Sequence, residues 1–169
     1  MKRVLCALWL LLLNGLALAE QPTSVATVAA ETGEARFQIY PKAKVGELML
    51  HRPGGKFSTI WLNKSDWQKV LAKVDASTKT KIAPGKTKSL GFWKFDVDAA
   101  LVTGGTADDA KTMRKLLKDQ HMGLALEVGR DPRGLYLEMK INDFAGELTL
   151  RFQGEKLSEL KKAAKQAKI

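Results

Sequence analysis

An α+β fold built from two similar units is what this 169-residue sequence predicts. Short runs alternate strictly between apolar and polar residues, which is typical of strands with one buried face. A stretch with apolar residues at helical spacing follows these runs, and the whole succession occurs twice along the chain. We therefore predict one α+β domain over 35–169. It holds two antiparallel βββα units, each a three-stranded meander with a packing helix, joined by a strand–helix connection.

The first unit is predicted over 35–75, with strands at 35–41, 46–52 and 57–62. Two glycines in the turn between the second and third strands supply the positive φ of a tight hairpin. The helix is predicted to begin at Ser65, because Ser65 and Gln68 have the S-x-x-Q spacing of a capping box. Its apolar stripe falls at i, i+3, i+4 and i+7, on Trp67, Val70, Leu71 and Val74.

The second unit is predicted over 123–169, with strands at 123–129, 135–142 and 146–153. A closing helix follows with the apolar stripe Leu157, Leu160, Ala164 and Ala167. An offset of 90 residues aligns the last strand and helix of the two units, matching Trp67 to Leu157 and Val70 to Leu160. Two explanations stay open, which are an internal duplication and the regular spacing found at any strand–helix boundary.

The connection is predicted over 76–122. Residues 76–88 are polar, rich in lysine and interrupted by Pro84-Gly85, so we expect them to be exposed. A long strand is then predicted over 89–103, with Trp93, Phe95 and Val97 on one face. A helix should follow, with Thr106 as its cap and acidic residues in its first turn, Asp108 and Asp109.

Residues 1–19 have the features of a secretory signal peptide. Lys2 and Arg3 precede an apolar run, and the run leads to a small-residue cleavage site at 17–19. We predict cleavage after Ala19, a periplasmic or secreted product, and a flexible leader over 20–34. The one cysteine, Cys6, would leave with the signal, which excludes thiol catalysis and cysteine-ligated metals from the mature chain.

Positive charge is the second marked feature, since 28 Lys and Arg residues stand against 18 Asp and Glu residues. Such a balance favours association with anionic polymers, anionic surfaces or acidic proteins. The linker and the C-terminus hold the residues predicted to bind anions, which are Lys79, Lys81, Lys86, Lys88, Lys161, Lys162, Lys165 and Lys168. A further basic group lies on the middle helix, at Lys111, Arg114, Lys115 and Lys118. The alternative is that these clusters are ordinary solvated faces.

An aromatic surface is the second candidate site. Trp61 lies on the strand face opposite Ile60 and Leu62, so a helix that covers those two residues would leave Trp61 outward. Beside Tyr40, Arg36 and Arg52, an outward Trp61 would form a stacking and cation–π surface. The alternative is a second buried layer against the strand that carries Trp93.

Motifs for phosphate or metal binding are incomplete. Gly85-Lys86-Thr87 ends like a phosphate-binding loop, but Thr80 stands where that motif needs its first glycine. The acidic first turn of the middle helix opposes an anion site at 103–106. Asp96 and Asp98 would share one strand face, as in some divalent-metal sites, but a solvated face is the simpler explanation.

Catalytic motifs are absent from the sequence as well. His51 and His121 lack the spacing of zinc ligands on one element, and no G-x-S-x-G elbow occurs. We therefore predict no catalytic residue, no metal and no cofactor.

Residues 57–74, FSTIWLNKSDWQKVLAKV, resemble the last strand and helix of the small modules found in the Pur and Whirly single-stranded nucleic-acid binders. Those modules are built as antiparallel strands followed by one packing helix, sometimes repeated. The resemblance covers only this stretch, and it implies the same sheet-plus-helix arrangement here.

The function predicted from these features is that of an exported, non-enzymatic binding protein with a basic surface for an anionic partner. The first alternative is an inhibitor or immunity-type protein that binds a secreted enzyme through a protruding loop, at 51–57 or 129–134. The second alternative is a hydrolase with dispersed catalytic residues. A cleft that gathers His51 or His121 with carboxylates would favour the hydrolase.

Overall fold

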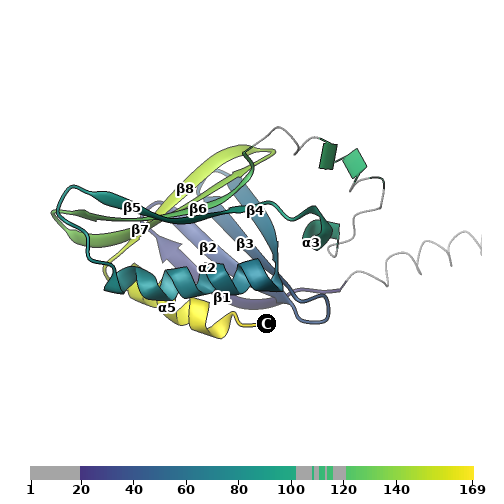
Figure 1. Ribbon diagram of the computed structural model, residues 1–169, viewed down its shortest axis with the longest axis horizontal. Helices are drawn as coiled ribbons and strands as arrows, with labels where there is room; N and C mark the ends of the chain where they lie inside the picture. The colour runs from purple at the N-terminus through teal and green to yellow at the C-terminus, as the bar shows by residue number, and fades with distance from the viewer. Residues whose placement is uncertain (1–19, 102–107, 109–110, 113, 116–120) are drawn as a thin grey trace, which may run out of the picture.

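The protein consists of two four-stranded antiparallel sheets and the helices packed against them, as seen in a computed structural model that describes residues 20–101, 108, 111–112, 114–115 and 121–169 (Figure 1). The first sheet has the strand order β1 (Thr23–Ala30), β2 (Gly33–Tyr40), β3 (Val45–Arg52), β4 (Lys56–Asn63). The second has the order β5 (Thr87–Lys94), β6 (Gly123–Asp131), β7 (Gly134–Asp143), β8 (Gly146–Gln153). Helix α2 (Lys64–Ala76) follows the first sheet and α5 (Glu155–Gln166) follows the second. The α+β class with two sheet-plus-helix units is confirmed.

Each sheet contains one strand more than the sequence predicted. The segment predicted as a flexible leader forms β1, which pairs with β2 in an antiparallel register that includes Thr27 opposite Arg36. Val28 and Ala30 of β1 are buried. The strand was missed because small alanines and threonines carry little of the alternation that marks a half-buried strand. The strand predicted within the connection is β5, and it pairs with β6 as a member of the second sheet.

The strand predicted over 89–103 was too long, since β5 ends at Lys94. Asp96 stops it: one carboxylate oxygen of Asp96 accepts hydrogen bonds from the backbone N–H groups of Asp98 (3.0 Å) and Ala99 (3.1 Å). That capping geometry starts the short helix α3 (Val97–Leu101). The Thr106 cap predicted for the next helix lies outside the described residues, as do Asp109, the segment 1–19 and Cys6.

The cap of helix α2 lies two residues earlier than predicted, at Asn63 rather than Ser65. The Asn63 side-chain oxygen accepts a hydrogen bond from the Asp66 N–H at 3.0 Å. Ser65 lies exposed in the first turn. Asparagine caps helices as well as serine does, and here it directly ends β4. The predicted apolar stripes of α2 and α5 are confirmed, since all eight stripe residues are buried.

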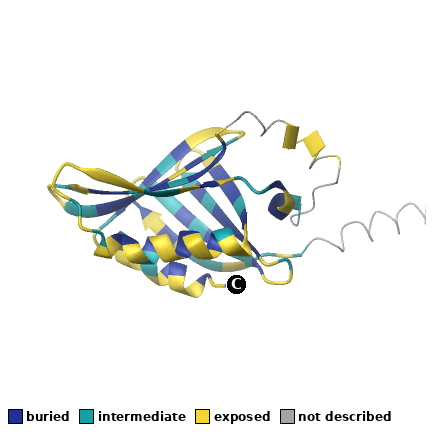
Figure 2. Ribbon diagram, viewed as in Figure 1, coloured by how far each residue is buried: buried dark blue, intermediate teal, exposed yellow. Residues whose placement is uncertain are grey.

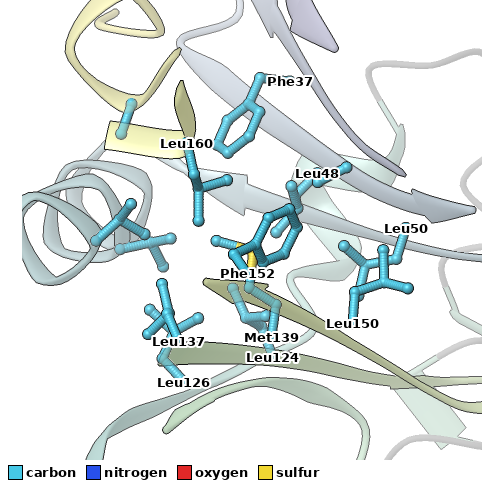
Figure 3. Packing of buried hydrophobic residues seen from close by; sticks show 14 of the residues in the cluster. Phe37, Leu48, Leu50, Leu124, Leu126, Leu137, Met139, Leu150, Phe152 and Leu160 are labelled. Carbon is cyan, nitrogen blue, oxygen red and sulfur yellow. The ribbon is translucent and has the colours of Figure 1, made fainter. Parts of the chain in front are cut away.

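One core fills the space between the two sheets and the two long helices. Figure 3 shows side chains of the first sheet, among them Phe37 and Leu48, meeting Met139 and Phe152 of the second sheet. Leu160 reaches this core from α5. In Figure 2 the strands and both helices are banded in buried and exposed residues, as amphipathic elements on a shared core should be. No helix among the described residues is long and apolar enough to cross a membrane.

Trp67 anchors this arrangement. Its ring is fully buried and lies against Gly46 of β3, where an added Cβ would come within 2.0 Å of the indole. The Trp67 Nε1–H donates to the Ala167 carbonyl oxygen at 2.6 Å. The same side chain therefore fills a recess in the first sheet and holds the end of α5 against the start of α2.

Candidate anion-binding surface

Helices α2 and α5 lie side by side and run antiparallel (Figure 1). Trp67, near the start of α2, bonds to Ala167 just beyond α5, whereas Asp75, near the end of α2, lies 3.5 Å from Lys165. The short helix η1 (Ser77–Lys79) continues α2 and meets α5 further upstream, where the Lys161 Nζ donates to the Thr78 hydroxyl at 2.6 Å. The lysine-rich linker therefore begins beside the lysine-rich C-terminal helix.

A surface hollow of about 380 Å³ lies at this meeting point. It is lined by two hydroxyl side chains and three ammonium groups, from Thr78, Ser158, Lys161, Lys162 and Lys165. We call it the basic hollow. Every lining residue can donate a hydrogen bond to an oxyanion, and three of them carry positive charge.

The positive charge of the basic hollow is only partly compensated. Lys161 is bonded to a hydroxyl, and Lys162 forms no ion pair within the described part of the chain. The Lys165–Asp75 pair is well exposed, so water screens it and its contribution is small. Glu155 and Glu159 stand on the same helix, and neither pairs with a lysine of the described ranges. The ammonium charges of Lys161 and Lys162 thus have no carboxylate partner among the described residues.

The other predicted lysines are distributed around the molecule. Lys79 belongs to the η1 turn that carries Thr78, and Lys168 lies beyond Lys165, past the end of α5. Lys81 is exposed in the connection. Lys86 and Lys88 instead belong to the β5 end of the second sheet, where the Lys86 carbonyl accepts from the Arg130 N–H at 3.2 Å. Of the four predicted linker lysines, none lines the basic hollow, and Lys79 is the one that stands next to Thr78 in η1.

The described basic residues predicted on the middle helix do not line the basic hollow. Lys111, Arg114 and Lys115 are exposed, and Arg114 pairs with Asp98, while Lys118 lies outside the described residues.

The predicted stacking surface is wrong, because Tyr40 is buried (4% exposed) and Trp61 is half-buried. The Tyr40 hydroxyl donates to Glu47 at 3.0 Å. The Trp61 ring packs edge-on against Phe95, with ring centroids 5.6 Å apart. Both aromatics belong to a second small cluster that Ala99 of α3 helps to cover. The alternative of a second buried layer fits, with Phe95 in place of the Trp93 that was expected.

Glu47 is a buried carboxyl that the sequence pattern did not reveal. It faces away from the main core along β3, on the side where strand alternation usually exposes a side chain, yet it is only 5% exposed. Burial raises its pKa above the ordinary value of 4.5, with the hydrogen bond from Tyr40 opposing the rise. Burial, and then the charge of Glu47, also raise the pKa of Tyr40. Glu47 and Tyr40 form a structural pair inside the second cluster.

The histidines do not gather a catalytic group in the part of the chain that the structure describes. His51 Nδ1 lies 3.9 Å from Glu34 Oε1, an oxygen that also accepts from Arg36. At His121 the backbone carbonyl accepts a hydrogen bond from the Asn142 side-chain amide at 3.1 Å. No serine, threonine or cysteine side chain among the described residues bonds to either imidazole.

Asp96 and Asp98 are engaged elsewhere and do not form the strand-face pair. Asp96 caps α3 and accepts from the Asn63 amide at 2.8 Å, and Asp98 pairs with Arg114. Among the described residues, no group of three or more His, Cys, Asp or Glu side chains is placed to hold a metal ion.

Sequence reasoning missed the two hydroxyl residues of the basic hollow, Thr78 and Ser158. Neither belongs to a motif, and Thr78 meets Lys161 only through a contact between residues 83 positions apart. No known family model matches this chain, and no curated protein is similar to it in sequence.

Proposed function

We propose that this chain is an exported, non-enzymatic binding protein whose basic hollow engages an anionic partner. The observation that carries the proposal is the convergence of Thr78 from the linker with three lysines of α5 around one hollow. Ammonium and hydroxyl donors in a concave site suit sulfate, phosphate or carboxylate groups. The excess of 28 basic over 18 acidic residues would add a long-range attraction for the same partners.

Binding of this kind should depend strongly on salt, because exposed ammonium groups release counterions from a polyanion. We expect the full chain to bind heparin and duplex DNA at low ionic strength. With about three phosphate contacts, affinity for duplex DNA should fall roughly 40-fold between about 50 and 200 mM salt. Titration at several salt concentrations measures this slope, with uncharged dextran as the control. Failure to bind heparin, DNA and anionic vesicles at low salt would overturn the proposal.

Export is the second part of the proposal, and it rests on the signal-like segment at 1–19. Exported material should begin at Glu20 when its N-terminus is sequenced. A product that begins at Met1 and stays with the membrane fraction would contradict export without affecting the anion site.

The inhibitor or immunity-type function has one observation in its favour. At the β3–β4 hairpin the Phe57 side chain is 57% exposed beside the turn glycines Gly54 and Gly55, as a protruding contact loop requires. The 129–134 loop fits less well, since Arg133 is tied to Glu31 and to Asp131. This function would take the place of the first one if the heparin titration fails.

A further inference from the structure

An apolar groove adjoins the basic hollow along the same pair of helices. The groove measures about 590 Å³ and lies between α2 and α5. Its apolar lining comes from Leu71 and Ala72 on one side and from Ala164 and Ile169 on the other. Lys165 lines both the groove and the basic hollow, so the two adjoin at this side chain, and we call them together the crease.

The hollow is lined by hydroxyl and ammonium groups, whereas the groove has Gln68, Asp75, Lys165 and Lys168 beside its four apolar residues. The helical rise of 1.5 Å per residue places Ser158, in the hollow, about 9 Å along the α5 axis from Ala164, in the groove. Asp75 is the acidic residue of the lining, and Lys165 lies 3.5 Å from it. The charge around the crease therefore favours an anion over a cation. The apolar part of its lining favours a ligand with an apolar segment, because covering this part removes apolar surface from water.

We infer that this crease binds a single-chain anionic amphiphile, such as an alkyl sulfate, an alkyl phosphate or a fatty acid. The inference rests on the proposed function, because the anionic headgroup occupies the basic hollow. The alkyl chain lies along the groove and covers Leu71 and Ala72. A hydrophilic polyanion such as heparin would use the hollow and leave the apolar groove empty, so the groove gives the amphiphile its advantage.

Chain length provides the direct test. Calorimetric titration of the full chain with inorganic sulfate and with hexyl, octyl and decyl sulfate, each below its micelle concentration, should show tighter binding with each longer chain. Complete burial of one methylene corresponds to about a fourfold gain in affinity, so we expect about two- to fourfold per methylene in a half-open groove. A neutral alkyl glucoside of equal chain length should bind at least about tenfold more weakly than the sulfate, because it lacks the charge-assisted contacts.

Two alanines on α2 offer a matched pair of variants. Ala72→Gln places a polar side chain in the groove, and Ala76→Gln places the same side chain on the same helix outside it. Both alanines are exposed, so both variants should fold. We expect Ala72→Gln to abolish the dependence on chain length while heparin binding stays within about twofold, and Ala76→Gln to behave as the wild type.

The outcomes separate this inference from the proposed function. If the protein binds heparin but its affinity does not rise from hexyl to decyl sulfate, the inference of an amphiphile ligand is overturned. The proposed role of the basic hollow is then unaffected. A chain-length dependence that persists in Ala72→Gln would overturn the placement of the chain. A glucoside that binds as tightly as the sulfate would overturn the role of the hollow. Binding of neither heparin nor alkyl sulfate would overturn both.

Discussion

Helices α2 and α5 occupy equivalent places in the two units, yet they differ in what they contribute. Helix α2 starts at a side-chain cap, Asn63, and inserts Trp67 into the core. Helix α5 starts after Gly154, whose φ of 59° is left-handed and which provides no side-chain hydrogen bond. At the position that the 90-residue offset matches to Trp67, α5 carries the smaller Leu157.

The difference indicates that the two similar units have different roles, one mainly in stability and the other mainly in binding. The cap and the large anchor of α2 hold its unit together, and Trp67 also fastens the end of α5. Helix α5 packs on β1 and β8 as well as on α2, and its outer face carries Lys161 and Lys162 of the basic hollow. Mutations in α2 should therefore affect stability most, and mutations on the outer face of α5 should affect binding.

The largest expected effect comes from the two anchors. Trp67→Ala should cost about 3–5 kcal/mol of unfolding free energy, because it empties the recess at Gly46 and removes the bond to Ala167. Leu157→Ala should cost about 2–4 kcal/mol, since it removes a smaller side chain and no hydrogen bond. Urea denaturation of both variants measures the two costs. Equal losses, or a near-neutral Trp67→Ala, would contradict the anchoring role of α2.

The buried carboxyl of the first unit predicts a pH effect. The pKa of Glu47 is raised in the folded state, so the folded chain keeps a proton that the unfolded chain releases above about pH 4.5. The contribution of this group to the free energy of unfolding is therefore fully present below that pH. It is lost as the pH rises through the folded-state pKa. Its hydrogen-bond partner is the Tyr40 hydroxyl, and Gln38 of β2 and Trp61 of β4 stand opposite it in the sheet, while the charge of Glu20 acts on Tyr40.

Glu47→Gln keeps an acceptor for Tyr40 and removes this titration. The variant should gain stability relative to the wild type as the pH rises from 4 to 7 in urea melts. Glu159→Gln, on the exposed face of α5, is the matched control and should show no such trend. A constant difference between Glu47→Gln and the wild type would show that burial does not perturb Glu47.

The smallest stability effect separates the two possible caps of α2. Asn63→Ala should cost about 1 kcal/mol, because it removes the acceptor of the Asp66 N–H. Ser65→Ala should stay within about 0.5 kcal/mol, as expected for an exposed residue without a capping bond. Thermal melts of the two single variants measure this difference. A larger loss of stability for Ser65→Ala than for Asn63→Ala would contradict the Asn63 cap and support the capping box at Ser65 that the sequence predicts.

Local periodicity was sufficient to predict most elements of this fold. Six strands and both long helices have clear alternation or a clear helical stripe, because each packs one face on a common core. Strand β1 has little such signal, since its small residues fit the sheet through pairing with β2. The end of β5 depends on the carboxylate of Asp96, whose capping role appears only when the backbone turns.

The candidate site was less predictable than the fold. The lysines were visible as clusters, but the contact of Lys161 with Thr78 depends on the antiparallel packing of α2 and α5. The error at Tyr40 has a related cause, because α3 covers a sheet face that alternation assigned to solvent. Long-range packing decides both cases, and no local pattern encodes it.

The most direct test of the central claim compares equal charge changes on the two equivalent helices. One variant replaces Lys161, Lys162 and Lys165 of α5 with Gln, and the other replaces the exposed Lys64, Lys69 and Lys73 of α2 with Gln. Both lose three positive charges, and thermal melts establish that both remain folded. The α5 variant should elute from immobilised heparin at clearly lower salt than the wild type, and the α2 variant should elute close to it. Equal shifts of the two variants would mean that net charge alone drives binding, and would contradict the basic hollow as the site.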